Sequence, residues 1–319
     1  MKKLKLAFVW DWENLWAQMI TWKDGLAAAI RILSEEWDVK VYSLGEDVVF
    51  RHDYFPITLK PTSEQLAETI LKEKPDAILV WGDFTRPTIP LIGSRGIPMA
   101  ICLAGGNVTN YIAHFDLIFV ESKSYKDRLE AEGRNVIQAF GTNTELFKPI
   151  KQPKIWDVIF PACFTMWKRH GLLVKTLAGK KGLACGWMRK KGRDTYCWQV
   201  CQDNGLTILP HVSSYVMPYL YNASKTCVIT STAIGGSQRT VLEAMACNIP
   251  VVVMEDSDKT REYVEASGIG EVSLREPENI IRAIDKSMDK EVNSRKWILN
   301  NYSEYIYAEK LKNGILSIL

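Results

Sequence analysis

Short apolar runs alternate with amphipathic stretches along the first 150 residues. Stretches with helical spacing of apolar residues, such as 27–33 and 63–72, separate runs of strand length. The strand-length runs are residues 4–10, 39–44, 77–81, 97–103 and 117–120. Strands that are apolar on both faces are typical of a parallel sheet with helices on each side. The pattern therefore predicts an α/β domain.

The same alternation begins again after a turn-rich link at 141–149. The predicted strands and helices of this half are residues 157–162, 172–178, 183–186, 196–202, 206–209, 227–230, 240–246 and 251–254, and a last helix covers 302–316. We predict an α/β fold with two Rossmann-like domains, 1–148 and 149–300, followed by a C-terminal helical segment, 301–319. Ligands bind beyond the carboxyl ends of such strands, which should line a cleft between the domains.

Length and composition agree with two domains and with a cytoplasmic protein. A chain of 319 residues is about twice the length of one ordinary domain, and 47% hydrophobic residues are enough for two cores. The first apolar run ends at Asp11, too early for a signal peptide, and no uncharged stretch resembles a membrane span. Seven cysteines, an odd number, fit reduced thiols. We expect the cytoplasm, or the host cytoplasm if the chain is viral.

Positive charge is concentrated in the second half of the chain. Residues 1–150 hold 17 Lys and Arg against 20 Asp and Glu, while residues 151–319 hold 23 against 17. Between Lys151 and Arg193, eleven basic residues face one acid, Asp157, which is a local excess of +10. Such a run is either the solvated face of amphipathic helices or a surface that binds phosphates.

Several common cofactor motifs are absent. Gly268-Ile-Gly270 lacks the third glycine of a dinucleotide fingerprint, and Gly105-Gly106 has the wrong spacing. There is no Walker lysine loop, and four scattered histidines without a paired cysteine motif indicate no metal site. A nicotinamide enzyme is therefore not expected.

The most informative segment is residues 231–250. A strand is predicted to end at Thr230, a glycine loop follows, and a helix begins near Gln238 with Glu243 in its second turn. Free backbone N–H groups at this helix start, helped by the helix dipole and by Arg239, form a site for a phosphate. A carboxylate at Glu243 is placed to accept both hydroxyls of a ribose.

Residues 242–252, Leu-Glu-Ala-Met-Ala-Cys-Asn-Ile-Pro-Val-Val, resemble the donor-site signature of retaining GT-B glycosyltransferases of the glycogen-synthase and mannosyltransferase type, the group 1 glycosyltransferases. Three further segments agree in order: 141–149 with the interdomain link, 217–225 with the segment before the donor strand, and 302–311 with the C-terminal helix. The resemblance covers 141–319 by motif and 1–140 by topology. It implies a GT-B fold in which the C-terminal helix packs back on the first domain.

The resemblance also implies roles for individual residues. Glu243 would bind the nucleotide ribose, and Lys168 with Arg169 would neutralise the leaving diphosphate. The full set of expected donor-binding residues is Gly235, Gly236, Ser237, Gln238, Arg239, Thr240 and Glu243. The donor would be a UDP-sugar or a GDP-sugar, no cofactor would be tightly bound, and transfer of the hexosyl or pentosyl group would retain its configuration.

Two positions depart from the family pattern. The family has a second glutamate eight residues before the one matched by Glu243, and this position is Gly235. The family's Gly-Arg pair is Ala162-Cys163, so one phosphate-binding arginine is missing. Either basic residues within 189–193 replace it, or the donor is held differently, or the chain is an inactive nucleotide- or sugar-binding relative.

The first domain is expected to bind the acceptor. Asp11 and Asp83 follow predicted strands, where a carboxylate could orient or deprotonate an acceptor hydroxyl, although acids at strand ends are commonly turn or cap residues. The expected acceptor-binding residues are Trp12, Gly105, Gly106 and Asn107. Tryptophan stacks on sugar rings and also on nucleobases.

The acceptor class stays open between a saccharide or lipid and a modified DNA base. Some phage enzymes of this fold glycosylate a hydroxymethylated base in DNA, and the basic region 151–193 would then bind the duplex. An anionic membrane surface is the rival polyanion, but the first domain, which docks on membrane in lipid-directed family members, sums to −3.

Overall fold

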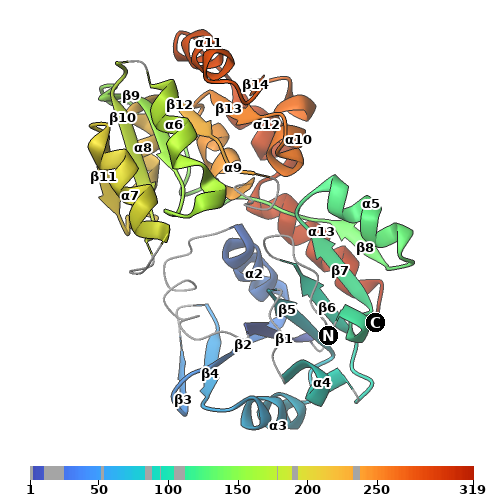
Figure 1. The fold of residues 1–319 in the computed structure, drawn as a ribbon. Helices are drawn as coiled ribbons and strands as arrows, with labels where there is room; N and C mark the ends of the chain where they lie inside the picture. Colours follow the sequence, from blue (N-terminus) through green and yellow to red (C-terminus); the bar gives the residue numbers. More distant parts are fainter. Residues whose placement is uncertain are drawn as a thin grey trace. The chain divides into compact units, whose positions relative to one another are not determined.

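The computed structural model describes residues 3–10, 25–51, 54–82, 88–93, 95–103, 112–177, 179–188, 193–232 and 238–319. Contacts divide the chain into two compact units (Figure 1). Unit 1 is Met1–Gly141 together with Glu304–Leu319, and unit 2 is Thr142–Ser303. The boundaries predicted from the sequence were 148/149 and 300/301. The predicted α/β class with two parallel-sheet domains is confirmed.

Within its described residues, unit 1 forms one sheet with the strand order β3-β4-β2-β1-β5-β6-β7-β8. All neighbours pair in parallel except β3 and β4, which form an antiparallel hairpin at one edge. The strands are β1 (Lys5–Trp10), β2 (Asp38–Leu44), β3 (Val48–Arg51), β4 (Pro56–Lys60), β5 (Ala77–Trp81), β6 (Met99–Cys102), β7 (Leu117–Val120) and β8 (Val136–Gln138). Its helices are α2 (Gly25–Glu36), α3 (Ser63–Glu73), α4 (Thr88–Gly93), η1 (Ile112–His114), α5 (Lys123–Ala131) and α13 (Glu304–Leu316).

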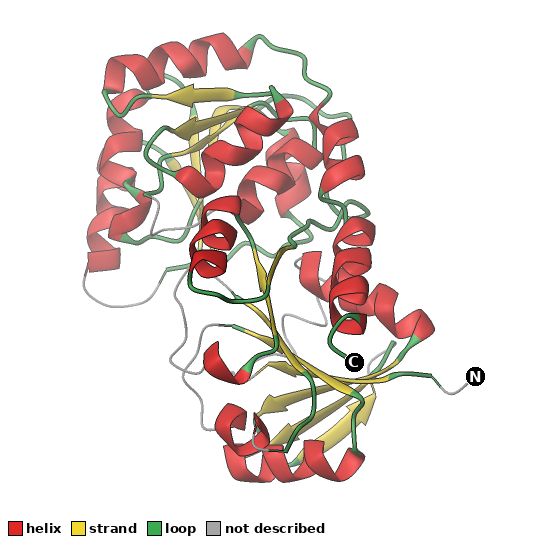
Figure 2. Cartoon of the chain, turned by 90° about the vertical axis from the view of Figure 1, so that its right-hand side faces the viewer, coloured by secondary structure: helices red, strands yellow, loops and turns green. Residues whose placement is uncertain are grey.

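Each face of this sheet has its own apolar core, and helices lie on both faces (Figure 2). Along β1, Phe8 and Trp10 pack into one core while Ala7 and Val9 pack into the other. This division follows from the strand geometry, in which successive side chains point to opposite faces. The continuous apolar run of β1 is therefore explained by burial on two sides.

The C-terminal helix α13 completes one of these cores. It lies beside α2, and Tyr307, Leu311 and Ile315, spaced four residues apart, are buried against the sheet. Gly314 allows the close approach, because a Cβ atom there would lie 2.7 Å from the ring of Phe119. The last residues of the chain are thus an integral part of unit 1.

Unit 2 has a parallel sheet with the order β11-β10-β9-β12-β13-β14 in its described residues. The strands are β9 (Trp156–Pro161), β10 (Gly182–Gly186), β11 (Thr207–Pro210), β12 (Ser224–Ile229), β13 (Val251–Met254) and β14 (Glu271–Ser273). The helices are η2 (Met166–Lys168), α6 (His170–Thr176), α7 (Arg193–Asp203), α8 (Met217–Asn222), α9 (Gln238–Ala246), α10 (Asp258–Ser267), α11 (Pro277–Met288) and α12 (Ser294–Asn301). None of the described helices has both the length and the apolar character that crossing a membrane requires.

Arg295, on α12, fixes the start of unit 2. Its guanidinium donates to the carbonyl oxygens of Phe147 (2.7 Å), Thr144 (3.0 Å) and Ala246 (3.2 Å). Because Ala246 is the last residue of α9, this side chain ties the segment after residue 141 to the end of α9. The planar guanidinium suits this task, since it offers several donors in a fixed geometry.

His170 is a polar residue inside the unit 2 core. Its ring stacks on Phe164 with centroids 4.9 Å apart and meets Phe160 edge-on at the same distance. Neither ring nitrogen has a hydrogen-bond partner among the described residues. Burial, and secondarily the charge of Lys168, lower the pKa of His170 from 6.5 to about 4. The imidazole is therefore neutral at physiological pH.

This depressed pKa predicts an acid-sensitive stability. The unfolded chain takes up a proton on His170 near pH 6.5, whereas the folded chain does so only near pH 4, so the free energy of unfolding falls as the pH falls between these values. The loss assigned to this group is about 3 kcal/mol. Urea unfolding at several pH values should show that His170→Phe removes that part of the pH dependence. His211→Asn, which replaces an exposed imidazole, is the control and should leave the dependence unchanged; equal pH profiles for His170→Phe and the unaltered chain would contradict the assignment.

Candidate functional site

The candidate donor site is built at the carboxyl edge of the unit 2 sheet. β9 leads into η2, which ends at Lys168, and the neighbouring strand β12 leads to Thr230. The Thr230 hydroxyl donates to the Lys168 carbonyl oxygen (2.7 Å), and the Thr232 amide donates to the Trp167 carbonyl oxygen (3.0 Å). These bonds join the lysine segment to the start of the predicted phosphate loop. The carboxyl edge is where ligands of parallel α/β sheets bind.

Lys168 is buried, with 7% of its surface exposed, and it is engaged in contacts of its own. Its neighbour Arg169 has a left-handed backbone, with φ 57° and ψ 48°, which is uncommon for a residue with a side chain. The Arg169 guanidinium is bound by both carboxylate oxygens of Asp256, at 2.9 and 2.6 Å. The two predicted cations therefore differ: the Arg169 guanidinium forms an ion pair with a carboxylate, and Lys168 is buried.

Asp256 follows β13 at the same edge of the sheet. A second guanidinium, that of Arg275, lies 3.6 Å from its Oδ2 atom. The hydrogen bond from Arg169, followed by the charges of Arg169 and Arg275, holds the pKa of Asp256 below its usual range. Two guanidiniums and one carboxylate leave this cluster with a net charge of +1.

Glu243 lies on α9, and only 6% of its surface is exposed. Its Oε2 atom accepts a hydrogen bond of 2.9 Å from the hydroxyl of Tyr221, which is fully buried at the end of α8. Burial, together with the charge of Glu243, raises the pKa of Tyr221 well above 10, so the phenol stays protonated and donates. Tyr221 is not among the predicted site residues, although it lies within the matched segment 217–225.

The other predicted donor residues are described only in part. The prediction that a helix begins near Gln238 is confirmed, since α9 starts there, with Arg239 and Thr240 half-buried in its first turn. Gly235, Gly236 and Ser237 lie outside the described residues. Among the described residues, no cluster of His, Cys, Asp and Glu side chains is arranged to hold a metal ion.

The predicted acceptor residues also lie outside the described part of the chain. These residues are Asp11, Trp12, Asp83, Gly105, Gly106 and Asn107. Among the described residues of unit 1, two tryptophans lie at the carboxyl ends of neighbouring strands. Trp10 and Trp81 are register partners, and their rings stack with centroids 4.0 Å apart and planes at 24°. Trp10 is buried and Trp81 half-buried, so this edge of unit 1 is aromatic.

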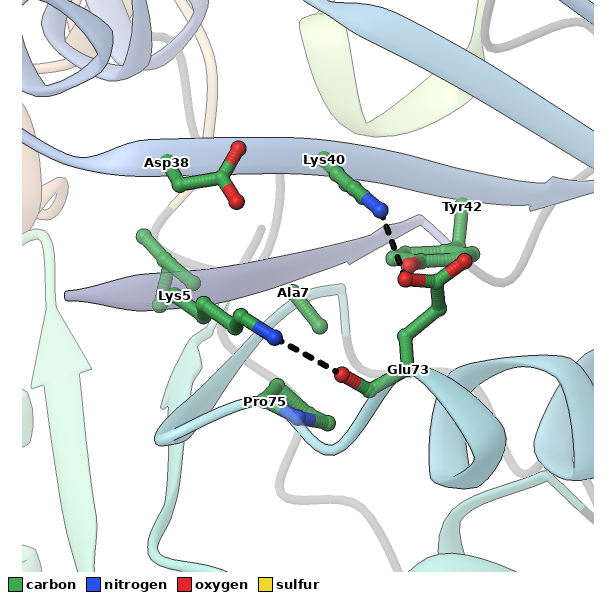
Figure 3. Close-up of a pocket in the computed structure, with 8 residues that line it drawn as sticks. Lys5, Ala7, Asp38, Lys40, Tyr42, Glu73 and Pro75 are labelled. Atoms are coloured by element: carbon green, nitrogen blue, oxygen red, sulfur yellow. Dashed lines mark hydrogen bonds and ion pairs between the residues drawn. The ribbon is translucent and has the colours of Figure 1, made fainter. Parts of the chain in front are cut away.

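Unit 1 also has a small, partly open pocket (Figure 3). It lies at the amino ends of β1 and β2, opposite the edge where acceptor residues are predicted. The Lys40 ammonium pairs with the Glu73 carboxylate at 2.6 Å, and the Lys5 ammonium donates to the Glu73 carbonyl oxygen at 3.5 Å. Because this pocket lies at the edge of the sheet opposite the predicted acceptor residues, we do not assign it to the transfer site.

The basic region 151–193 does not form one exposed surface within its described residues. Lys168 is buried, Arg169 binds Asp256, and the Lys180 ammonium lies 2.9 Å from a carboxylate oxygen of Asp285. The Lys154 ammonium donates to the carbonyl oxygens of Asn222 (3.0 Å) and Ser224 (2.8 Å). The exposed basic residues among those described in this region are Lys151, Lys154, Lys175 and Lys181. The side chains of Arg189, Lys190, Lys191 and Arg193 lie outside the description.

Residues 153–304 match the family model described as "Glycosyl transferases group 1". This range covers nearly all of unit 2, including Lys168, Tyr221 and Glu243. No curated protein sequence matches the chain.

Solved structures resemble the whole chain. HepE from Anabaena, in complex with UDP and glucose, is 15% identical with a TM-score of 0.76, and the match covers 99% of this chain and 100% of that chain. Sucrose-phosphate synthase from Thermosynechococcus elongatus is 14% identical, with a TM-score of 0.71 and 98% of each chain covered. The UDP-forming α,α-trehalose-phosphate synthase from Burkholderia vietnamiensis is 10% identical, with a TM-score of 0.71 and coverage of 100% and 99%. The fold is therefore GT-B, and the match of residues 153–304 to the group 1 model supports glycosyltransferase activity.

Proposed function

We propose that the protein transfers a sugar from a nucleotide diphosphate sugar to a hydroxyl acceptor and retains the anomeric configuration. The observation that carries the proposal is the buried, hydrogen-bonded carboxylate of Glu243, which lies in the segment that resembles the family's ribose-binding signature. UDP is the favoured carrier, because the similar HepE structure contains UDP and the similar trehalose-phosphate synthase is UDP-forming.

The proposed chemistry depends on stabilising the leaving diphosphate. Breaking the bond between sugar and phosphate builds negative charge on the departing oxygen, and fixed cations or backbone N–H groups aimed at it lower the barrier. Lys168 and the start of α9 would supply this stabilisation. Arg169 shares its charge with Asp256, so we assign it the smaller part. With retention, the leaving phosphate can take the proton of the acceptor hydroxyl; inversion would require a base such as Asp11 or Asp83.

Glu243→Ala tests the donor site. Removing the carboxylate removes charge-assisted hydrogen bonds to the ribose hydroxyls, so we expect calorimetry with UDP to show a dissociation constant more than tenfold higher. Glu278→Ala changes an exposed glutamate on α11 and serves as the control. Unchanged affinity in Glu243→Ala would refute the assignment.

Lys168→Ala tests the leaving-group role. A cation that acts mainly on the developing charge should lower kcat, by about 10²-fold, with a much smaller change in KM. Lys175→Ala, an exposed lysine of the same unit, should leave both constants unchanged. Because Lys168 is buried, the melting temperature of the variant is compared first; a folded variant with full turnover would contradict the role.

The departures at Gly235 and Cys163 favour one alternative, a relative that binds nucleotide or sugar without catalysis. Such a protein would bind UDP yet neither hydrolyse nor transfer from a UDP-sugar. Turnover by the unaltered chain, assayed by release of UDP, distinguishes the two functions.

For the acceptor we propose a saccharide rather than a DNA base. Four of the seven basic residues described in 151–193 are buried or bound within unit 2, which leaves three of the described ones for a duplex. The DNA alternative is supported by the excess of +10 over this range.

A gel shift with duplex DNA compares these acceptors. We expect only weak retention at 150 mM salt. A DNA enzyme with six or more phosphate contacts would bind tightly at 50 mM salt and lose about 10³-fold in affinity by 200 mM. Tight binding with that salt dependence would overturn the saccharide proposal.

A further inference from the structure

We propose that Tyr221 is a positioning residue that orients Glu243 for recognition of the ribose hydroxyls, and so sets the selectivity of the site for ribonucleotides. The inference rests on the proposed function, in which Glu243 binds the ribose. It adds a residue from a different helix, 22 positions before Glu243 in the chain.

A hydrogen bond joins the side chains of Tyr221 and Glu243. The phenol oxygen of Tyr221 lies 2.9 Å from Oε2 of Glu243, and this bond joins α8 to α9. The phenol ring has no exposed surface and packs edge-on against Phe147, with centroids 6.1 Å apart. A rigid donor of this kind fixes the plane of the carboxylate, whereas a glutamate side chain has three rotatable bonds.

Tyr221 is itself held by its surroundings. The next residue, Asn222, accepts from the Ile150 amide (2.9 Å) and donates to the carbonyl oxygens of Lys148 (2.9 Å) and Pro218 (2.8 Å). These bonds anchor the end of α8 to the segment that enters unit 2. The phenol hydroxyl therefore has a fixed position, and its hydrogen bond can set the orientation of the Glu243 carboxylate.

The groups around this pair are poor substitutes for the phenol. Three buried thiols lie close enough to Glu243 for its charge to raise their pKa values: Cys185, Cys227 and Cys247. Burial raises the pKa of Cys185 and of Cys247 to about 12, so both stay neutral. A thiol is a weak hydrogen-bond donor, and hence none of these three can replace the bond from Tyr221.

The experiment measures selectivity rather than affinity alone. Dissociation constants for UDP and for its 2′,3′-dideoxy analogue are measured by calorimetry on the unaltered chain, on Tyr221→Phe and on Tyr219→Phe. Tyr219 lies on the same helix with 55% of its surface exposed, so it is a matched control. We expect the unaltered chain and Tyr219→Phe to prefer UDP by tenfold or more, and Tyr221→Phe by less than threefold.

A purely structural role for Tyr221 predicts a different result. It would weaken both ligands equally and leave the ratio unchanged, and that result would overturn the inference. The ratio is insensitive to partial unfolding, because both constants refer to the same folded protein. A double-mutant cycle gives a second measurement: Tyr221→Phe added to Glu243→Gln should change the ratio no further, and an additive change would also overturn the inference.

Failure of the proposed function has its own signature. If the unaltered chain binds UDP and its dideoxy analogue equally well, then Glu243 does not recognise the ribose, and the role of Tyr221 falls with that assignment. If the unaltered chain discriminates and Tyr221→Phe discriminates equally, only the further inference fails.

Discussion

Parallel pairing of β12 between β9 and β13 is the constraint on which the candidate donor site depends. In a parallel sheet every strand ends at the same edge, so the segments that follow the strands lie close together even when they are distant in sequence. Lys168 follows β9, Thr230 ends β12, and Asp256 follows β13. The bond from Thr230 to the Lys168 carbonyl oxygen then fixes two of these segments to each other. Such convergence allows groups from several segments to face one ligand.

At the same edge, Arg169 has a strained backbone conformation, and its ion pair with Asp256 helps to maintain it. A left-handed backbone at a residue such as Arg169 costs about 1 kcal/mol or more, so it persists only where the surroundings fix it. The bidentate pair with Asp256 anchors the guanidinium, and the Arg169 amide donates to the Met166 carbonyl oxygen at 3.0 Å. The turn after η2 is thereby fixed at both its backbone and its side chain, which keeps the adjoining Lys168 in place.

Some of this organisation was predictable from the sequence, and the rest was not, for physical reasons. Apolar runs predicted β1, β2, β5 and β7 because strands buried on both faces leave a continuous signal. They did not predict β3, whose residues are mostly exposed, or the three-residue β8. The helix start at Gln238 was predictable because a glycine loop precedes it and helical spacing of apolar residues follows it. The pair of Arg169 with Asp256 joins residues 87 positions apart and left no local pattern. Tyr221 lies in a matched segment, but its hydrogen bond to Glu243 joins two different helices and could be identified only from the structure.

The charge balance at this edge includes the position where the sequence departs from the family pattern. Cys163 stands where the resemblance implies an arginine, and burial places Cys185 and Cys247 among the neutral groups of unit 2. The cluster of Arg169, Arg275 and Asp256 nevertheless keeps a net charge of +1 at the ends of β9, β13 and β14. Lys168 adds a positive charge to this edge, and Glu243 adds a negative one. The field that an anionic ligand meets depends on the sum of these charges and not on any single pair, so Arg169 still contributes to it although its guanidinium is paired with Asp256.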